Sequence, residues 1–71
     1  MTGKDLMRRL RKLARERGTD FRHDPSHGAG SHGRIYWGTA FTTLQDAKRD
    51  IPKGTLNRML KDLGLTLDDI A

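Results

Sequence analysis

The chain has 71 residues, enough for one small domain with a thin core, which we expect to span residues 1–71. It contains no cysteine, which excludes disulfides and thiolate metal sites, and its net charge of +5 points to a polyanion or an acidic protein as partner. No apolar run approaches the length of a membrane span and no signal-peptide pattern is present, so we expect a cytoplasmic protein without membrane association.

The first predicted element is an amphipathic helix over residues 4–17, capped by Thr2 with Asp5 three residues later and ended by Gly18. Its apolar face follows helical spacing and consists of Leu6, Met7, Leu10, Leu13 and Ala14. Its opposite face is basic and carries Arg8, Arg11, Lys12 and Arg15. That basic face fits either a solvated surface or a contact with RNA or a partner protein.

Three strands are predicted next, over residues 19–23, 32–37 and 40–44, with residues 24–31 as a loop rich in turn formers. In the first strand Phe21 is expected to point inward. Gly38 and Thr39 suit a two-residue hairpin turn between the other two strands. That turn predicts three cross-strand pairs, namely Trp37 with Ala40, Tyr36 with Phe41, and Arg34 with Thr43.

Alternation along the second strand predicts two different faces. Gly33, Ile35 and Trp37 share the face that can bury. His32, Arg34 and Tyr36 share the other, which combines a proton carrier, a fixed cation and an aromatic ring. Such a combination can handle a phosphodiester, and the flanking glycines leave room for a bulky backbone to approach the imidazole.

A second helix is predicted from Pro52, which suits a first turn, to Gly64, which suits an end. Its apolar stripe consists of Leu56, Met59, Leu60 and Leu63. Residues 66–69 then form a capped final turn. The order of one helix, three antiparallel strands and a second helix predicts an α+β fold with both helices on one face of the sheet.

Two motifs in this order resemble the HicA family of mRNA interferase toxins. Gly30-Ser31-His32 opens the second strand, and Asp50-Ile51-Pro52-Lys53-Gly54-Thr55-Leu56 continues into the second helix. With the preceding helix, the resemblance covers nearly the whole chain. The chain departs from the family at Gly33, where a second histidine is common, and at Ile35, where an aromatic residue often stands.

The resemblance implies a double-stranded-RNA-binding-domain-like fold. It also implies cleavage of mRNA by a single histidine without a metal or other cofactor, and neutralisation by a HicB-type antitoxin. Carried over by position, the catalytic histidine is His32. No direct binding to DNA is expected.

The residues themselves support this chemistry, although each also has a plainer interpretation. His32 can act as acid or base, or it can be a surface histidine at a strand end. Arg34 could stabilise the developing phosphorane charge, with help from Ser31. Tyr36 and Phe41 fit either a stacking platform for an unpaired base or a cross-strand aromatic pair that shields the sheet.

Two further groups of residues leave alternatives open. The start of the second helix, with Lys53 beside it, is either a phosphate seat or an ordinary capped helix with surface lysines. Three histidines and one aspartate lie close together in the sequence and could chelate zinc, namely His23, Asp24, His27 and His32. Their spacing is not that of a defined zinc-ligand set. Besides an endoribonuclease, the sequence is compatible with a non-catalytic RNA-binding module and with an interaction protein that docks its basic helix on an acidic partner.

Overall fold

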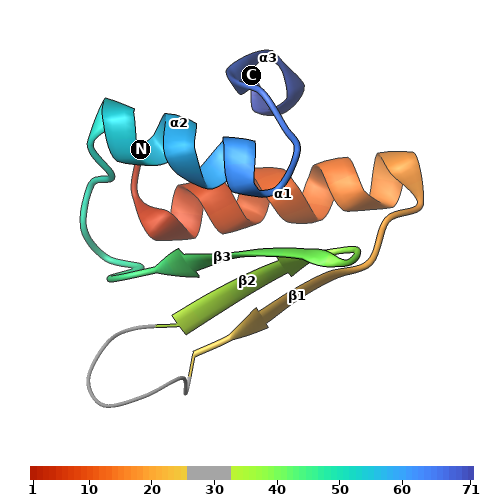
Figure 1. Ribbon diagram of the computed structural model, residues 1–71, viewed down its shortest axis with the longest axis horizontal. Helices are drawn as coiled ribbons and strands as arrows, with labels where there is room; N and C mark the ends of the chain where they lie inside the picture. Colours follow the sequence, from red (N-terminus) through yellow and green to blue (C-terminus); the bar gives the residue numbers. More distant parts are fainter. Residues whose placement is uncertain (26–32) are drawn as a thin grey trace.

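Two layers, a three-stranded sheet and the helices packed against it, make up the computed structural model, which describes residues 1–25 and 33–71 (Figure 1). The elements in chain order are α1 (Gly3–Arg17), β1 (Phe21–Asp24), β2 (Gly33–Trp37), β3 (Ala40–Leu44), α2 (Lys53–Asp62) and α3 (Leu67–Ile70). The predicted order is therefore confirmed, and the predicted final turn is the short helix α3. Within the described part of the chain, no helix is long and apolar enough to cross a membrane.

The strands form an antiparallel sheet in the order β1-β2-β3. The register between β2 and β3 is the predicted one, with Trp37 opposite Ala40 and Tyr36 opposite Phe41. Gly38 begins the connecting turn with a φ of 59°, a left-handed conformation that glycine adopts without strain. Because side chains alternate across a strand, this register also confirms the two predicted faces within β2. The buried face holds Gly33, Ile35 and Trp37.

The first strand begins two residues later and ends one residue later than the sequence predicts. Its ladder with β2 starts at Phe21, which lies opposite Trp37. The chain turns directly after Trp37, so Thr19 and Asp20 lie before the strand and form the connection from α1, although the Asp20 carbonyl still accepts from the Gly38 N–H at 2.9 Å. The N–H of Thr19 donates to the Ala14 carbonyl at 2.9 Å. Phe21 packs against the core, as predicted.

Helices α1 and α2 both lie on one face of the sheet, as predicted (Figure 1). Ile35 of β2 is fully buried beneath them, and the hydroxyl of the buried Thr42 donates to Oδ2 of Asp62 at 2.9 Å, which ties β3 to α2. The core between the layers is almost entirely aliphatic. Its buried members are Leu6, Met7, Leu10, Leu13, Ala14, Ile35, Trp37, Leu44, Leu56, Met59, Leu60, Leu63, Leu65 and Ile70.

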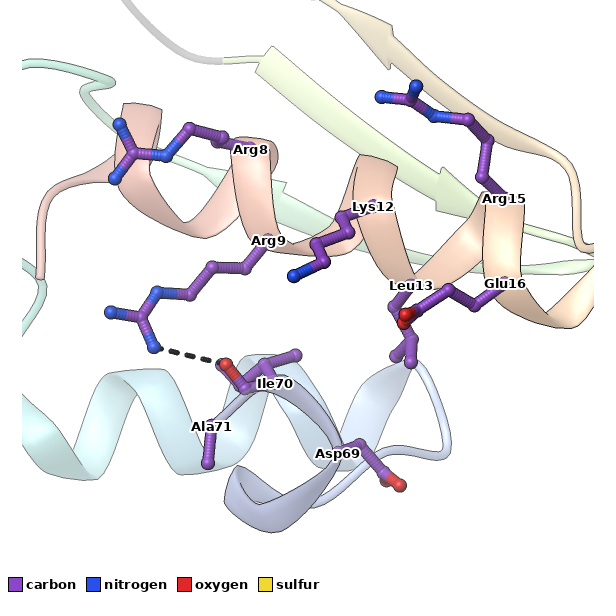
Figure 2. A pocket seen from close by; sticks show the side chains of 9 residues that line it. All are labelled: Arg8, Arg9, Lys12, Leu13, Arg15, Glu16, Asp69, Ile70 and Ala71. Carbon is purple, nitrogen blue, oxygen red and sulfur yellow. Dashed lines mark hydrogen bonds between the residues drawn. The ribbon is translucent and has the colours of Figure 1, made fainter.

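The short helix α3 is held against α1 by polar contacts as well as by the buried Ile70. Nη1 of Arg9 donates to the carbonyl oxygen of Ile70 at 3.0 Å (Figure 2). Nη2 of Arg17 reaches Oδ1 of Asp69 at 2.6 Å, and the other carboxylate oxygen of Asp69 accepts from the Thr66 N–H at 2.8 Å. Asp69 therefore caps α3 and pairs with α1 at once.

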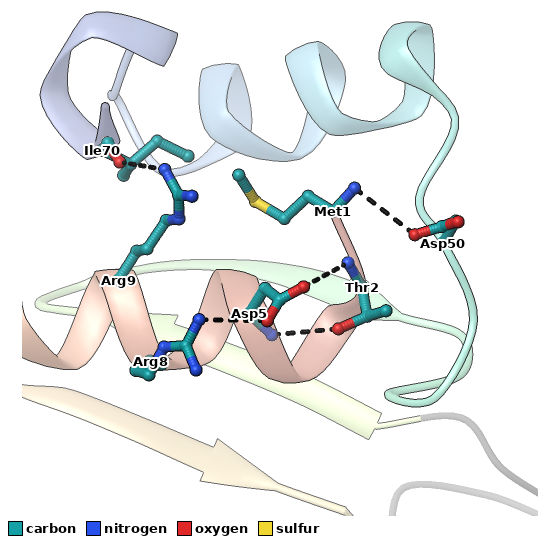
Figure 3. A network of polar contacts seen from close by, with 7 residues as sticks. All are labelled: Met1, Thr2, Asp5, Arg8, Arg9, Asp50 and Ile70. Carbon is teal, nitrogen blue, oxygen red and sulfur yellow. Dashed lines mark hydrogen bonds and ion pairs between the residues drawn. The ribbon is translucent and has the colours of Figure 1, made fainter.

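The start of α1 follows the predicted capping pattern, and the helix begins one residue earlier, at Gly3. The Asp5 N–H donates to Oγ1 of Thr2, and the Thr2 N–H donates back to Oδ2 of Asp5 (Figure 3). Hydrogen bonding from the Thr2 backbone, followed by that from its hydroxyl, lowers the pKa of the Asp5 carboxyl. At the other end Gly18 has a φ of 66° and stops the helix, as predicted.

Candidate nucleic-acid interface

Among the residues that the structure describes, no helix or strand covers the sheet face turned away from α1 and α2 (Figure 1). The strand register places Arg22, Tyr36 and Phe41 in one row across the three strands. The next row consists of Asp24, Arg34 and Thr43. We call these six residues the open face. It combines two aromatic rings, two guanidinium groups and one carboxylate in an area three strands wide.

Cations lie over both rings of the open face. The guanidinium carbon of Arg22 is 4.3 Å from the ring centroid of Tyr36, and that of Arg34 is 4.7 Å from the centroid of Phe41. The two ring centroids are 6.2 Å apart, with the ring planes tilted by 40°. Each such cation–π contact contributes about 0.5–1 kcal/mol at an exposed site. The arrangement offers flat surfaces for bases and positive charge for phosphates.

The cross-strand pair of Tyr36 and Phe41 that the sequence suggests is present. It does not cover the sheet, however, because 49% of Phe41 remains exposed. An exposed aromatic side chain with one arginine over its ring is compatible with a stacking platform, so the cross-strand pair does not exclude that interpretation. Arg22 is the member of the open face that sequence reasoning missed. Its signal is simple alternation, because an inward Phe21 turns the next side chain outward.

The structure brings together only part of the predicted site. Arg34 and Tyr36 lie side by side in β2 on the open face, as predicted. His32 and Ser31 lie outside the described residues, so their roles stay predictions. Lys53 is exposed at the first residue of α2, within the helical layer, and the fold does not place it on the open face (Figure 1).

A groove of about 560 Å³ separates the end of β3 from the start of α2. Thr43 of the open face lines it, together with Arg49 and Arg58, whereas Lys53 does not. In the described part of the chain no side chain caps this helix start, and its first turn holds no acidic residue. The expected ordinary cap is therefore absent, although Lys53 is exposed as that alternative also expects. Asp46 and Asp50 line the same groove, so negative charge lies close to the positive end of the helix dipole.

Position 33 has no room for a side chain. A Cβ atom there would lie 2.8 Å from the carbonyl oxygen of Asp24 and 3.2 Å from the Cα atom of Pro25. Both contacts are with backbone, at the point where β1 ends beside the start of β2. Close backbone approach therefore accounts for the glycine at position 33.

A second basic surface lies between α1 and α3, away from the open face. The groove there has a volume of about 840 Å³, with Leu13 and Ile70 among its apolar lining. Figure 2 shows the side chains of Arg8, Arg9 and Lys12 extending from α1 beside it. None of the described residues that line it is aromatic, so its chemistry differs from that of the open face.

The residues considered for a metal are not gathered in the described part of the chain. His23 lies opposite Ile35, on the covered side of the sheet, whereas Asp24 belongs to the open face. His27 and His32 lie outside the described residues. Across residues 1–25 and 33–71, no group of three or more His, Asp or Glu side chains could hold a metal ion.

Comparisons of the chain with family models, with curated proteins and with solved structures found no match. The function of the chain must therefore be inferred from the two sequence motifs and from the chemistry of the open face.

Proposed function

We propose that this protein is a HicA-like toxin, a cytoplasmic endoribonuclease that cleaves mRNA with His32 and without a metal. The observation that carries the proposal is the placement of the Gly30-Ser31-His32 motif immediately before a strand whose outward residues, Arg34 and Tyr36, belong to a basic and aromatic open face. A histidine next to such a surface is where a bound phosphodiester would meet an acid–base group.

The chemistry needs few protein groups because RNA carries its own nucleophile. His32 takes the proton from the 2′-hydroxyl as a general base, and the oxygen attacks the adjacent phosphorus. The resulting imidazolium, or water, supplies a proton to the departing 5′-oxygen. Arg34 stabilises the charge that develops on the phosphorane, and Ser31 adds a hydrogen bond. Tyr36 contributes to RNA binding through stacking, and Lys53, which lies outside the open face, contributes only through its charge.

A non-catalytic RNA-binding module is the second candidate, and a specific observation favours it. The open face holds two arginines, one tyrosine, one phenylalanine, one aspartate and one threonine. None of them is a histidine, the residue that most often acts as acid or base near neutral pH. The open face can therefore bind RNA without cutting it, and the acid–base step of catalysis depends on His32.

Expression of the chain from a tightly repressed promoter separates the two candidates. We expect the wild type to arrest growth and degrade mRNA, and His32→Ala to abolish both effects while staying folded. His23→Ala is the matched control, because this histidine belongs to β1 on the covered side of the sheet. Trp37, the only tryptophan and a buried one, reports on folding. Full toxicity of a folded His32→Ala variant would refute the assignment.

The proposed partner is an acidic HicB-type antitoxin that covers the His32 side of the sheet. A basic toxin must be silenced while it is being synthesised, and a site with one catalytic histidine can be blocked by simple occlusion. Exposed ion pairs are individually weak and are screened by salt. Occlusion therefore contributes more to inhibition than charge pairing does.

A further inference from the structure

The alternation of rings and guanidinium groups continues beyond the open face. Phe21 follows the same strand as Arg22 but turns to the other side, and the guanidinium carbon of Arg11 lies 5.6 Å from its ring centroid. Arg11 and Arg15 of α1 line a shallow groove of about 540 Å³ together with Phe21. A line of cation–aromatic contacts therefore runs from Phe41 across the sheet, around the β1 edge and onto α1.

We propose that this line is the path of a single-stranded RNA, with unpaired bases on Tyr36 and Phe41 and the sugar–phosphate backbone passing the β1 edge to Arg11 and Arg15. The inference rests on the proposed function, because it extends the same RNA site. Stacking on rings requires bases that are not paired in a duplex. The platform therefore selects single strands over A-form duplexes.

The pairing of the arginines in α1 indicates which of them are available to phosphates. Arg8 pairs with Asp5 at 3.1 Å and Arg17 with Asp69 at 2.6 Å. Arg11 and Arg15, by contrast, have no carboxylate partner within the described residues. Because they are one helical turn apart, they lie on the same side of α1.

The aromatic contacts also favour RNA over an acidic protein as the occupant of this path. An acidic peptide can be bound by basic side chains beside an apolar surface, without aromatic residues. The groove between α1 and α3 already provides such a surface. Nucleic-acid bases stack on aromatic rings and on guanidinium planes. A ring and a guanidinium group occur together at each of the three cation–aromatic contacts along the path. Asp20 lines the groove beside Arg11 and would oppose a phosphate there.

Binding can be measured by fluorescence anisotropy in the His32→Ala background, which prevents cleavage. The probes are labelled oligouridylates of about 4 and about 12 nucleotides, lengths that span the usual range for single-strand sites. The test variant carries Arg11→Ala and Arg15→Ala. The matched control carries Arg8→Ala and Lys12→Ala, which removes the same charge at the same spacing from the groove beside α3. Arg15 lines both grooves, so Arg11→Ala and Lys12→Ala are also compared as single variants, each confined to one groove.

We expect the test variant to bind the long probe on the order of tenfold more weakly, and the short probe as the parent does. The slope of log affinity against log salt should fall by about 1.4, since each lost phosphate contact contributes about 0.7 on single strands. The control should change binding of the long probe less than threefold, roughly the difference expected from diffuse charge alone. Asp20→Asn should tighten binding.

Three results would overturn the path. Equal losses in the test and control variants would mean that α1 acts only through diffuse charge. Unchanged binding of both probes in the test variant would remove α1 from the RNA site, and equal competition by duplex RNA would remove the preference for single strands. If the parent binds neither probe, RNA recognition itself fails, and the proposed function fails with it.

Discussion

Replacement of Gly33 by alanine should destabilise the fold although it adds one methyl group. The new Cβ atom would lie 2.8 Å from the Asp24 carbonyl oxygen, and the neighbouring Cα atom of Pro25 is also backbone, so no flexible side chain can move aside. Overpacking of this kind costs about 2 kcal/mol. In a domain of this size, that loss lowers Tm by roughly 8–16 °C.

The matched control for this prediction is Gly54→Ala. Gly54 is exposed in the first turn of α2, and a Cβ atom there meets no atom within 4 Å. Alanine should raise stability by about 0.5–1 kcal/mol through helix propensity. Both variants are compared with the wild type by urea and thermal unfolding, with Trp37 fluorescence as the signal. Equal stability of Gly33→Ala and the wild type would refute the close-approach argument.

Three other predictions concern catalysis, pH and the partner. At saturating RNA, Arg34→Ala should slow cleavage more than Arg11→Ala, because Arg34 belongs to the open face and Arg11 to α1; equal rates would contradict the assignment of faces. The pKa of Asp5 is lowered in the folded chain, so its stabilising effect is present at neutral pH and is lost as acid protonates it. Asp5→Ala should therefore lower Tm at pH 7, and this effect should shrink as the pH falls through the lowered pKa of Asp5; a loss of Tm that does not change with pH would exclude the charged cap. The antitoxin complex should survive salt that removes RNA, as a salt series on the co-purified pair would reveal; simultaneous dissociation would indicate inhibition by charge.

Local signals predicted most of the fold. The pair of Thr2 and Asp5 marks the start of α1 because their hydrogen bonds are local, and Gly38 determines the register of β2 with β3 for the same reason. The start of β1 was not predictable in this way. The β1–β2 ladder ends at Trp37, where the β2–β3 turn begins, so Phe21 is the first residue of β1 that has a partner in β2. This limit is set by another strand and not by the residues around Phe21.

The candidate site was less accessible to sequence reasoning than the fold. Alternation alone placed Arg34 and Tyr36 together, and the same rule applied to β1 would have found Arg22. The position of Lys53 relative to the open face depends on how α2 packs on the sheet, and the residues around Lys53 do not predict that packing. The need for glycine at position 33 arises from the passage of another strand, which the sequence of β2 does not reveal.

The most direct measurement is an incubation of purified protein with a defined single-stranded mRNA in excess EDTA, with analysis of the product ends. Attack by the 2′-hydroxyl predicts cleavage that persists in EDTA, disappears in His32→Ala and leaves 2′,3′-cyclic phosphate and 5′-hydroxyl ends. Cleavage that needs an added metal ion, or intact RNA with a folded wild-type protein, would contradict the account.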